Sequence, residues 1–148
     1  MKYRQIHFVV SGFFCKFVRV MRINMKTYKV IIAGSRKFND YAKLKENCDR
    51  ILRKKLEDEE CNIVIVSGHA KGADVLGEHY ACERRLQLDA YPADWKQYGR
   101  AAGIIRNKEM AESADALIAF PQEGEKSRGT WNMVKTARAR GLKCDVVE

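Results

Sequence analysis

The feature that most constrains the fold is a strand, a short loop and a helix start between residues 63 and 74. The apolar run Ile63–Val66 ends at Ser67-Gly68, and Gly72-Ala73-Asp74 opens a helical pattern. Glycines in such a loop let backbone N–H groups approach a ligand closely, and the N-terminus of a helix favours an anion. The segment therefore predicts a buried strand that carries a ligand-binding loop to the edge of a sheet.

The same strand-then-helix pattern repeats along the chain. Runs of apolar and β-branched residues predict five strands, over residues 28–33, 61–66, 86–91, 116–120 and 142–147. Apolar residues three and four apart predict helices between them, over residues 41–56, 74–85, 97–113 and 129–140. Strands that alternate with helices in this way predict an α/β fold with a mainly parallel five-stranded sheet and helices on both faces.

Residues 1–24 differ in composition from the 124 residues that follow. They carry five basic residues and no acidic one, so they supply five of the nine net positive charges of the 148-residue chain. Met25 resembles a natural start just ahead of the first predicted strand. We expect an N-terminal extension outside the core over residues 1–24 and a single domain over residues 25–148. An extra strand or a partner-binding arm is the alternative for the extension.

Composition also excludes several classes of protein. The five cysteines are far apart and form no C-x-x-C pair, which argues against a disulfide framework or a zinc site and fits a reducing compartment. No run of about 18 uncharged apolar residues is present, so we expect no membrane span. We therefore expect a cytoplasmic protein that holds no metal and no cofactor.

Four loops follow predicted strands and should converge on one edge of the sheet, at residues 34–36, 67–74, 94–95 and 121–130. In the first loop, Ser35 can donate a hydrogen bond to a phosphate and Arg36 can pair with one. In the last loop, Ser127, Gly129 and Thr130 stand at a helix start and form a second candidate phosphate cradle. The sequence contains neither a G-x-G-x-x-G nor a G-x-x-x-x-G-K-[ST] motif, so ordinary dinucleotide binding and ATP hydrolysis lose their usual support.

Several side chains near these loops have more than one interpretation. Asp74 can cap the helix that follows it, or accept a hydrogen bond from a ribose hydroxyl or a base edge. Trp95 can stack on a base or cover the edge of the core. We interpret His69 as a solvent-facing loop histidine, since no acid–base partner is assignable. On the helix predicted over residues 97–113, Arg100 should share a face with Asn107.

Six short motifs, in order along the chain, resemble the SLOG superfamily and within it the small YspA/cpYpsA-related proteins. They are Gly34-Ser35-Arg36-x-Phe38, Ser67-Gly68-x-Ala70-x-Gly72-Ala73-Asp74, Asp94-Trp95-x-x-Tyr98-Gly99, Ala102-Gly103-x-x-Arg106-Asn107-x-x-Met110, Ala114-Asp115 and Ser127-x-Gly129-Thr130. The similarity covers about residues 28–147. It implies a Rossmann-like three-layer fold and a pocket for nucleotides or nucleotide-derived ligands.

The loops and the resemblance together predict the ligand-binding residues. They are Gly34, Ser35, Arg36, Ser67, Gly68, Ala70, Gly72, Ala73, Asp74, Asp94, Trp95, Arg106, Asn107, Ser127, Gly129 and Thr130.

The superfamily also contains LOG enzymes, which hydrolyse the base–ribose bond of nucleoside monophosphates. Their R-K-x-x-M segment is similar to residues 106–110, and their P-G-G-x-G-T-x-x-E segment is loosely similar to residues 121–133. The chain departs from both, because Asn107 replaces the lysine and Met133 stands where the glutamate is expected. An acidic group would stabilise an oxocarbenium-like transition state, so its absence puts this hydrolysis in doubt. Arg106 and Asp74 are the candidate catalytic residues, and Glu123, Glu125 or Asp74 is a candidate to substitute for the missing glutamate.

We predict that the protein binds or senses a nucleotide or nucleotide-derived ligand at the carboxyl ends of the strands. Two alternatives stay open, which are a nucleotide N-glycosidic hydrolase and a single-stranded nucleic-acid binding protein. The net positive charge and Trp95 are compatible with nucleic acid as a partner. The sequence is also compatible with a homo-oligomer.

Overall fold

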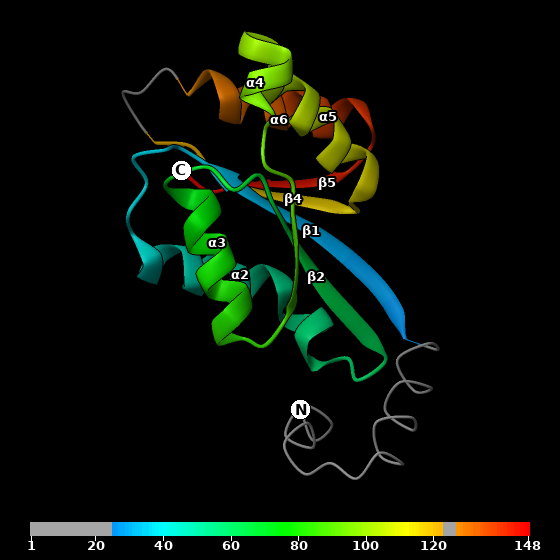
Figure 1. Ribbon diagram of the computed structural model, residues 1–148. Coiled ribbons are helices and arrows are strands. Elements are labelled where there is room, and N and C mark those ends of the chain that lie inside the picture. The colour runs from blue at the N-terminus through cyan, green and yellow to red at the C-terminus, as the bar shows by residue number, and fades with distance from the viewer. Residues whose placement is uncertain (1–24, 123–126) are drawn as a thin grey trace, which may run out of the picture.

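A computed structural model describes residues 25–122 and 127–148 of the chain (Figure 1). The extension predicted over residues 1–24 lies outside the described residues, as do Glu123 and Glu125. The strands are β1 (Lys26–Gly34), β2 (Cys61–Ser67), β3 (Gln87–Ala90), β4 (Ala116–Phe120) and β5 (Lys143–Val146). The helices are α2 (Tyr41–Glu57), α3 (Ala73–Glu83), α4 (Trp95–Tyr98), the 3-10 turn η2 (Gly99–Ala101), α5 (Ala102–Ser113) and α6 (Arg128–Ala139).

All five strands are parallel and lie in the order β3-β2-β1-β4-β5. The central strand β1 pairs with β2 on one side and with β4 on the other, so that Val30 lies opposite both Ile65 and Ala116. The direction of chain progression therefore reverses between β1 and β4. In open parallel sheets, ligands bind beyond the carboxyl ends of the strands at such a reversal.

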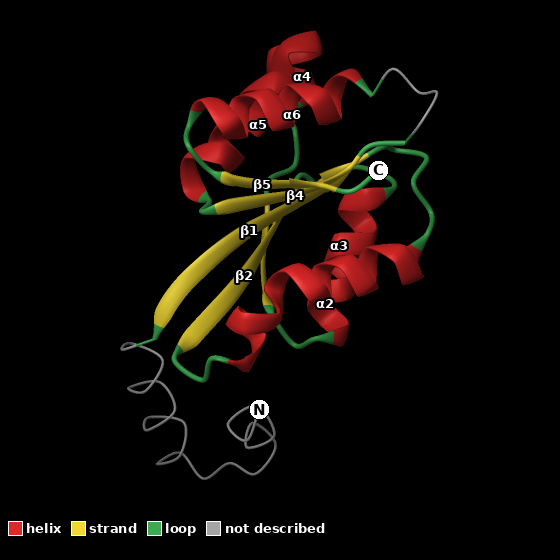
Figure 2. Cartoon of the chain, turned by 180° about the vertical axis from the view of Figure 1, so that it is seen from behind, coloured by secondary structure: helices red, strands yellow, loops and turns green. Residues whose placement is uncertain are grey.

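Helices cover both faces of the sheet, with α2 and α3 on one face and α5 and α6 on the other (Figure 2). Alternate residues of β1 enter the two cores, because successive side chains of a strand point to opposite faces. Val30 and Ile32 pack with residues of α2 and α3, whereas Ile31 and Ala33 pack with residues of α5 and α6. The α/β, three-layer fold predicted from the sequence is confirmed, and the sheet is parallel throughout.

The four predicted helices are present, but the one expected over residues 97–113 is not continuous. The side chain of Asp94 accepts a hydrogen bond from the backbone N–H of Gln97 at 2.9 Å. Asp94 is therefore the N-cap of α4, a helix of four residues. Gly99, with φ of 52°, ends α4 because few other residues adopt that left-handed conformation. Arg100 consequently lies in the exposed turn η2, and the prediction that it shares a face of one helix with Asn107 is wrong.

Each of the described helices is too short or too polar to cross a bilayer. Four cysteines, Cys48, Cys61, Cys82 and Cys144, carry free thiols.

Candidate functional site

A cavity of about 280 Å³ lies beyond the carboxyl ends of β1, β2 and β4. The loop after β1, the loop after β2 with the first turn of α3, the middle of α5 and the start of α6 form its walls. It therefore occupies the reversal between β1 and β4. Ten of the predicted binding residues line it, namely Gly34, Ser35, Arg36, Ala70, Asp74, Arg106, Asn107, Ser127, Gly129 and Thr130.

The loops after β1 and β2 are packed directly against each other at Gly72. This glycine is the N-cap of α3 and has φ of 81°, and a Cβ atom there would lie 2.2 Å from the carbonyl oxygen of Ser35. The same carbonyl accepts a hydrogen bond from the N–H of Ala73 at 3.2 Å. Because Gly72 has no side chain, the first turn of α3 packs closely against the loop after β1, which forms one wall of the cavity.

Asp74 faces the cavity from the first turn of α3. Since Gly72 is the N-cap, Asp74 does not cap the helix, and the Oδ2 atom instead accepts a hydrogen bond from the N–H of Ala70 at 3.3 Å. The residue is 5% exposed. Burial raises the pKa of Asp74 to about 6, against the opposing effects of the Ala70 N–H and the positive charge of Arg106.

Arg106 reaches across the cavity from α5 to the loop after β2. Its Nη1 atom donates a hydrogen bond to the carbonyl of Gly68 at 2.7 Å. A Cβ atom at Gly68 would lie 3.0 Å from the Arg106 Cζ and 2.8 Å from the Asp74 Oδ2, so a side chain at this position would displace both groups. The Arg106 Nε is buried without a hydrogen-bond partner among the described residues. Burial lowers the pKa of Arg106 from its ordinary value, although the carboxylate of Asp74 opposes the shift.

The N-terminus of α6 forms a further wall of the cavity. Ser127 is its N-cap, yet the side chain makes no capping hydrogen bond, and its buried Oγ has no partner within the described parts of the chain. Asn107 is 4% exposed and ties α5 to this end, because its Nδ2 donates to the Gly129 carbonyl at 3.3 Å and to the Asn132 Oδ1 at 3.0 Å. The first N–H groups of a helix are unpaired within the helix and carry partial positive charge.

The cavity therefore combines a buried guanidinium and a helix N-terminus with one buried carboxylate. The guanidinium and the helix end favour an anion, and the carboxylate favours a hydroxyl or amine that donates a hydrogen bond. A ligand with a phosphate beside a hydroxylated sugar offers both. The described residues contain no group of three or more side chains suited to hold a metal ion.

The other six predicted binding residues lie outside the cavity. Ser67, Gly68, Gly72 and Ala73 shape the β2 loop behind its wall, and Asp94 serves as the N-cap of α4. Trp95 is 51% exposed, and the guanidinium of the cavity residue Arg36 lies 5.9 Å from the centroid of its ring. The structure thus brings Trp95 close to the cavity mouth through Arg36.

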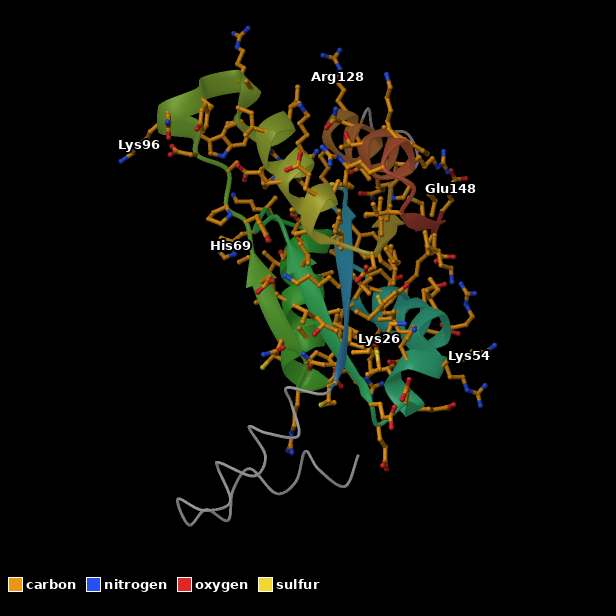
Figure 3. All side chains as sticks on the ribbon, turned by 90° about the vertical axis from the view of Figure 1, so that its right-hand side faces the viewer. Lys26, Lys54, His69, Lys96, Arg128 and Glu148 are labelled. Atoms are coloured by element: carbon orange, nitrogen blue, oxygen red, sulfur yellow. The ribbon has the colours of Figure 1, made fainter. Side chains whose placement is uncertain are left out.

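Figure 3 shows Lys96 and Arg128 near the carboxyl end of the sheet, away from Lys26 at the start of β1.

Four residues of the cavity and one that supports it are not among the binding residues predicted from the sequence. Ala33, Met110, Arg128 and Met133 complete the lining. Both methionines are apolar positions of amphipathic helices, and such residues are ordinarily assigned to the core. The supporting residue is Glu78, whose Oε1 lies 2.9 Å from the Nδ1 of His69. As predicted, His69 is exposed. Its partner Glu78 lies nine residues later on α3, and a separation of nine residues between a loop and a helix does not indicate a contact in the sequence.

We expect Asp74→Asn to stabilise the protein at pH 8 by about 1–3 kcal/mol. The folded chain binds a proton at Asp74 more tightly than the unfolded chain, because the pKa is about 6 when folded against an ordinary 3.8. The free energy of unfolding should therefore fall as the pH rises from about 4 to about 6 and stay low above it. Urea unfolding of wild type and variant from pH 4 to 8 tests this. Equal stability at pH 8 would show that the carboxylate is not desolvated.

Comparisons with known proteins point to one family. Residues 28–98 match the model of the YspA, cpYpsA-related SLOG family. The Gene 61 protein of Mycobacterium phage D29 is 31% identical over 120 residues, which cover 77% of this chain and 91% of the phage protein.

Proposed function

Because the chain belongs to the YspA, cpYpsA-related SLOG family, we propose that its cavity binds a nucleotide or nucleotide-derived ligand through the phosphate. One observation carries the proposal. The Arg106 Nε and the Ser127 Oγ both belong to residues of the cavity wall, and both are buried without partners among the described residues. Buried polar atoms are normally hydrogen-bonded, so two unpaired ones at a single cavity are best explained by a ligand that accepts from them.

In this proposal the phosphate lies between Arg106 and the N-terminus of α6. The N–H groups around Gly129 and the hydroxyl of Ser127 donate to it, and Arg36 and Arg128 add positive charge at the mouth. A ribose hydroxyl then donates to the carboxylate of Asp74. The base extends toward the exposed face of Trp95, where aromatic stacking accepts any base.

Isothermal titration calorimetry tests the proposal with AMP, GMP, CMP, UMP, ribose 5-phosphate and adenosine. We expect the phosphorylated compounds to bind and adenosine to bind at least about tenfold more weakly, because a charged hydrogen bond contributes about 1.5–3 kcal/mol. Binding of adenosine as tight as that of AMP would contradict phosphate recognition.

A nucleotide N-glycosidic hydrolase is the second candidate, and the environment of Asp74 favours it. A buried carboxylate in a cavity, with its pKa raised to about 6, is of the kind that acts as an acid or base near neutral pH. Met133, at the position of the expected glutamate, is 1% exposed and lines the cavity, so it supplies no acid. Release of free adenine from AMP by the wild type but not by Asp74→Asn would favour the hydrolase.

Three further expectations stay predictions. The exposed Trp95 and Tyr98 on α4 are compatible with stacking on single-stranded nucleic acid, which a steep salt dependence of oligonucleotide binding would support. A cytoplasmic location and a homo-oligomeric state rest on the sequence alone.

A further inference from the structure

Glu78 lies on α3 one helical turn after Asp74 and holds the loop after β2. Its Oε1 accepts a hydrogen bond from the hydroxyl of Ser67 at 2.8 Å and lies 2.9 Å from the Nδ1 of His69. The hydroxyl of Ser67 in turn accepts from the backbone N–H of His69 at 3.0 Å. One carboxylate on α3 thus fixes the residues on both sides of Gly68.

The backbone between these attachments carries two contacts of the binding site. The carbonyl of Gly68 accepts from Arg106, and the N–H of Ala70 donates to Asp74. His69 has φ of 53°, a conformation that is uncommon outside glycine and turns the backbone sharply at this point. A strained residue persists when surrounding contacts determine its conformation, and Glu78 supplies two of those contacts.

We propose that Glu78, acting through Ser67 and His69, is a positioning residue that sets how Arg106 and Asp74 are presented to a bound phosphate compound. This inference rests on the proposed function, since it concerns the same cavity. Glu78 does not line the cavity, so we expect it to act on a bound compound without contacting it. Its side chain is 18% exposed against 59% for His69, so the carboxylate is partly desolvated and its hydrogen bonds are stronger than those at a wet surface.

The φ of 53° at His69 is one that a glycine would also adopt, without a side chain to anchor. The imidazole therefore adds an attachment between the loop and α3 that a glycine cannot make. Figure 3 shows His69 and Arg128 apart along the carboxyl edge, so this attachment lies away from the α6 wall.

Two measurements on Glu78→Gln test the inference, one without ligand and one with it. The first is the ¹⁵N spectrum of the unliganded protein, in which the buried Nε–H of Arg106 reports how that side chain is held. We expect Glu78→Gln to shift or broaden this signal and those of the His69 and Ala70 amides. The second is calorimetric titration with AMP, for which we expect an affinity about two- to thirty-fold weaker, the range for residues that act on a site without contact.

The matched control is Glu83→Gln on the same helix. Glu83 bonds to Tyr41 and Lys45 of α2 and touches neither the loop nor the cavity. We expect it to leave the Arg106 signal and the AMP affinity unchanged. His69→Gly, at an exposed position whose φ suits glycine, provides a second variant in case Glu78→Gln does not fold. It should weaken AMP binding in the same direction.

The outcomes separate the two proposals. An unchanged Arg106 signal and unchanged AMP affinity in both loop variants would overturn the positioning role even if the wild type binds AMP. A wild type that binds no phosphorylated compound would overturn the proposed function, while the spectrum would still decide whether Glu78 positions Arg106. A merely structural role predicts the same loss of AMP affinity in wild-type and Arg106→Ala backgrounds. Positioning predicts a clearly smaller loss in Arg106→Ala, because only the contribution through Asp74 remains there.

Discussion

Arg106→Ala is expected to weaken the binding of AMP by about 10- to 150-fold, which corresponds to about 1.5–3 kcal/mol. The guanidinium is the group of the cavity that combines a full positive charge with a buried N–H lacking a partner among the described residues. Its loss removes a charge-assisted hydrogen bond to the phosphate. It also leaves the carboxylate of Asp74 without the positive charge that lowers its pKa. Calorimetric titration of wild type and variant at the same salt concentration measures the effect.

Arg100→Ala is the control for this prediction. Arg100 lies six residues before Arg106 but is exposed in the η2 turn and does not line the cavity. The two substitutions change the net charge equally, so a general electrostatic effect would weaken binding alike in both. We expect Arg100→Ala to leave the AMP affinity within about twofold, because exposed charges are screened by solvent and salt. Equal losses in the two variants would remove Arg106 from the site.

Gly72→Ala should lower the free energy of unfolding by about 2–4 kcal/mol. The φ of 81° is costly for alanine, and its Cβ would lie 2.2 Å from the Ser35 carbonyl oxygen and 2.6 Å from the carbonyl carbon of Arg36. These are backbone atoms, so they cannot move aside as the end of a flexible side chain can. Urea unfolding measures the stability. We also expect AMP binding to weaken, because the loops after β1 and β2 must separate.

Gly103→Ala is the matched comparison on α5. Its Cβ would meet only the Cη2 of Trp95, at an ordinary contact distance of 3.5 Å. Alanine is the better helix former, so the variant should be as stable as the wild type or more stable by up to about 1 kcal/mol. A Gly72→Ala protein as stable as Gly103→Ala would show that the two loops are not packed as described.

The fold could be predicted because each element has a strong local signal. The uninterrupted apolar runs of β1, β2 and β4 are those of strands buried on both faces, and the alternation with helices implies parallel strands. The side chain of Asp40, a residue type that favours helix starts, accepts from the N–H of Lys43 at 2.9 Å and caps α2. The end of α4 at Gly99 was not predicted, because the spacing of apolar residues continues through this position. A positive φ at one residue does not change that spacing.

The candidate site was predicted only as far as the loops that follow the strands. That reasoning brings Ser35, Asp74 and Gly129 to one edge, and the cavity contains all three. The role of Asp74 could not be decided from the sequence, because it depends on where α3 begins. The N-cap is Gly72, so Asp74 lies inside the first turn and does not cap the helix. Glu78 could not be found either, since a hydrogen bond between a helix and a loop depends on their packing and not on spacing.

The central claim is that the cavity between β1 and β4 recognises the phosphate of a nucleotide. Native mass spectrometry of the protein mixed with equal amounts of AMP and adenosine tests it directly, because the two ligands compete for one site and differ in mass. We expect a one-to-one complex with AMP that disappears in Arg106→Ala. Adenosine bound as readily as AMP, or an AMP complex that persists unchanged in Arg106→Ala, would contradict it.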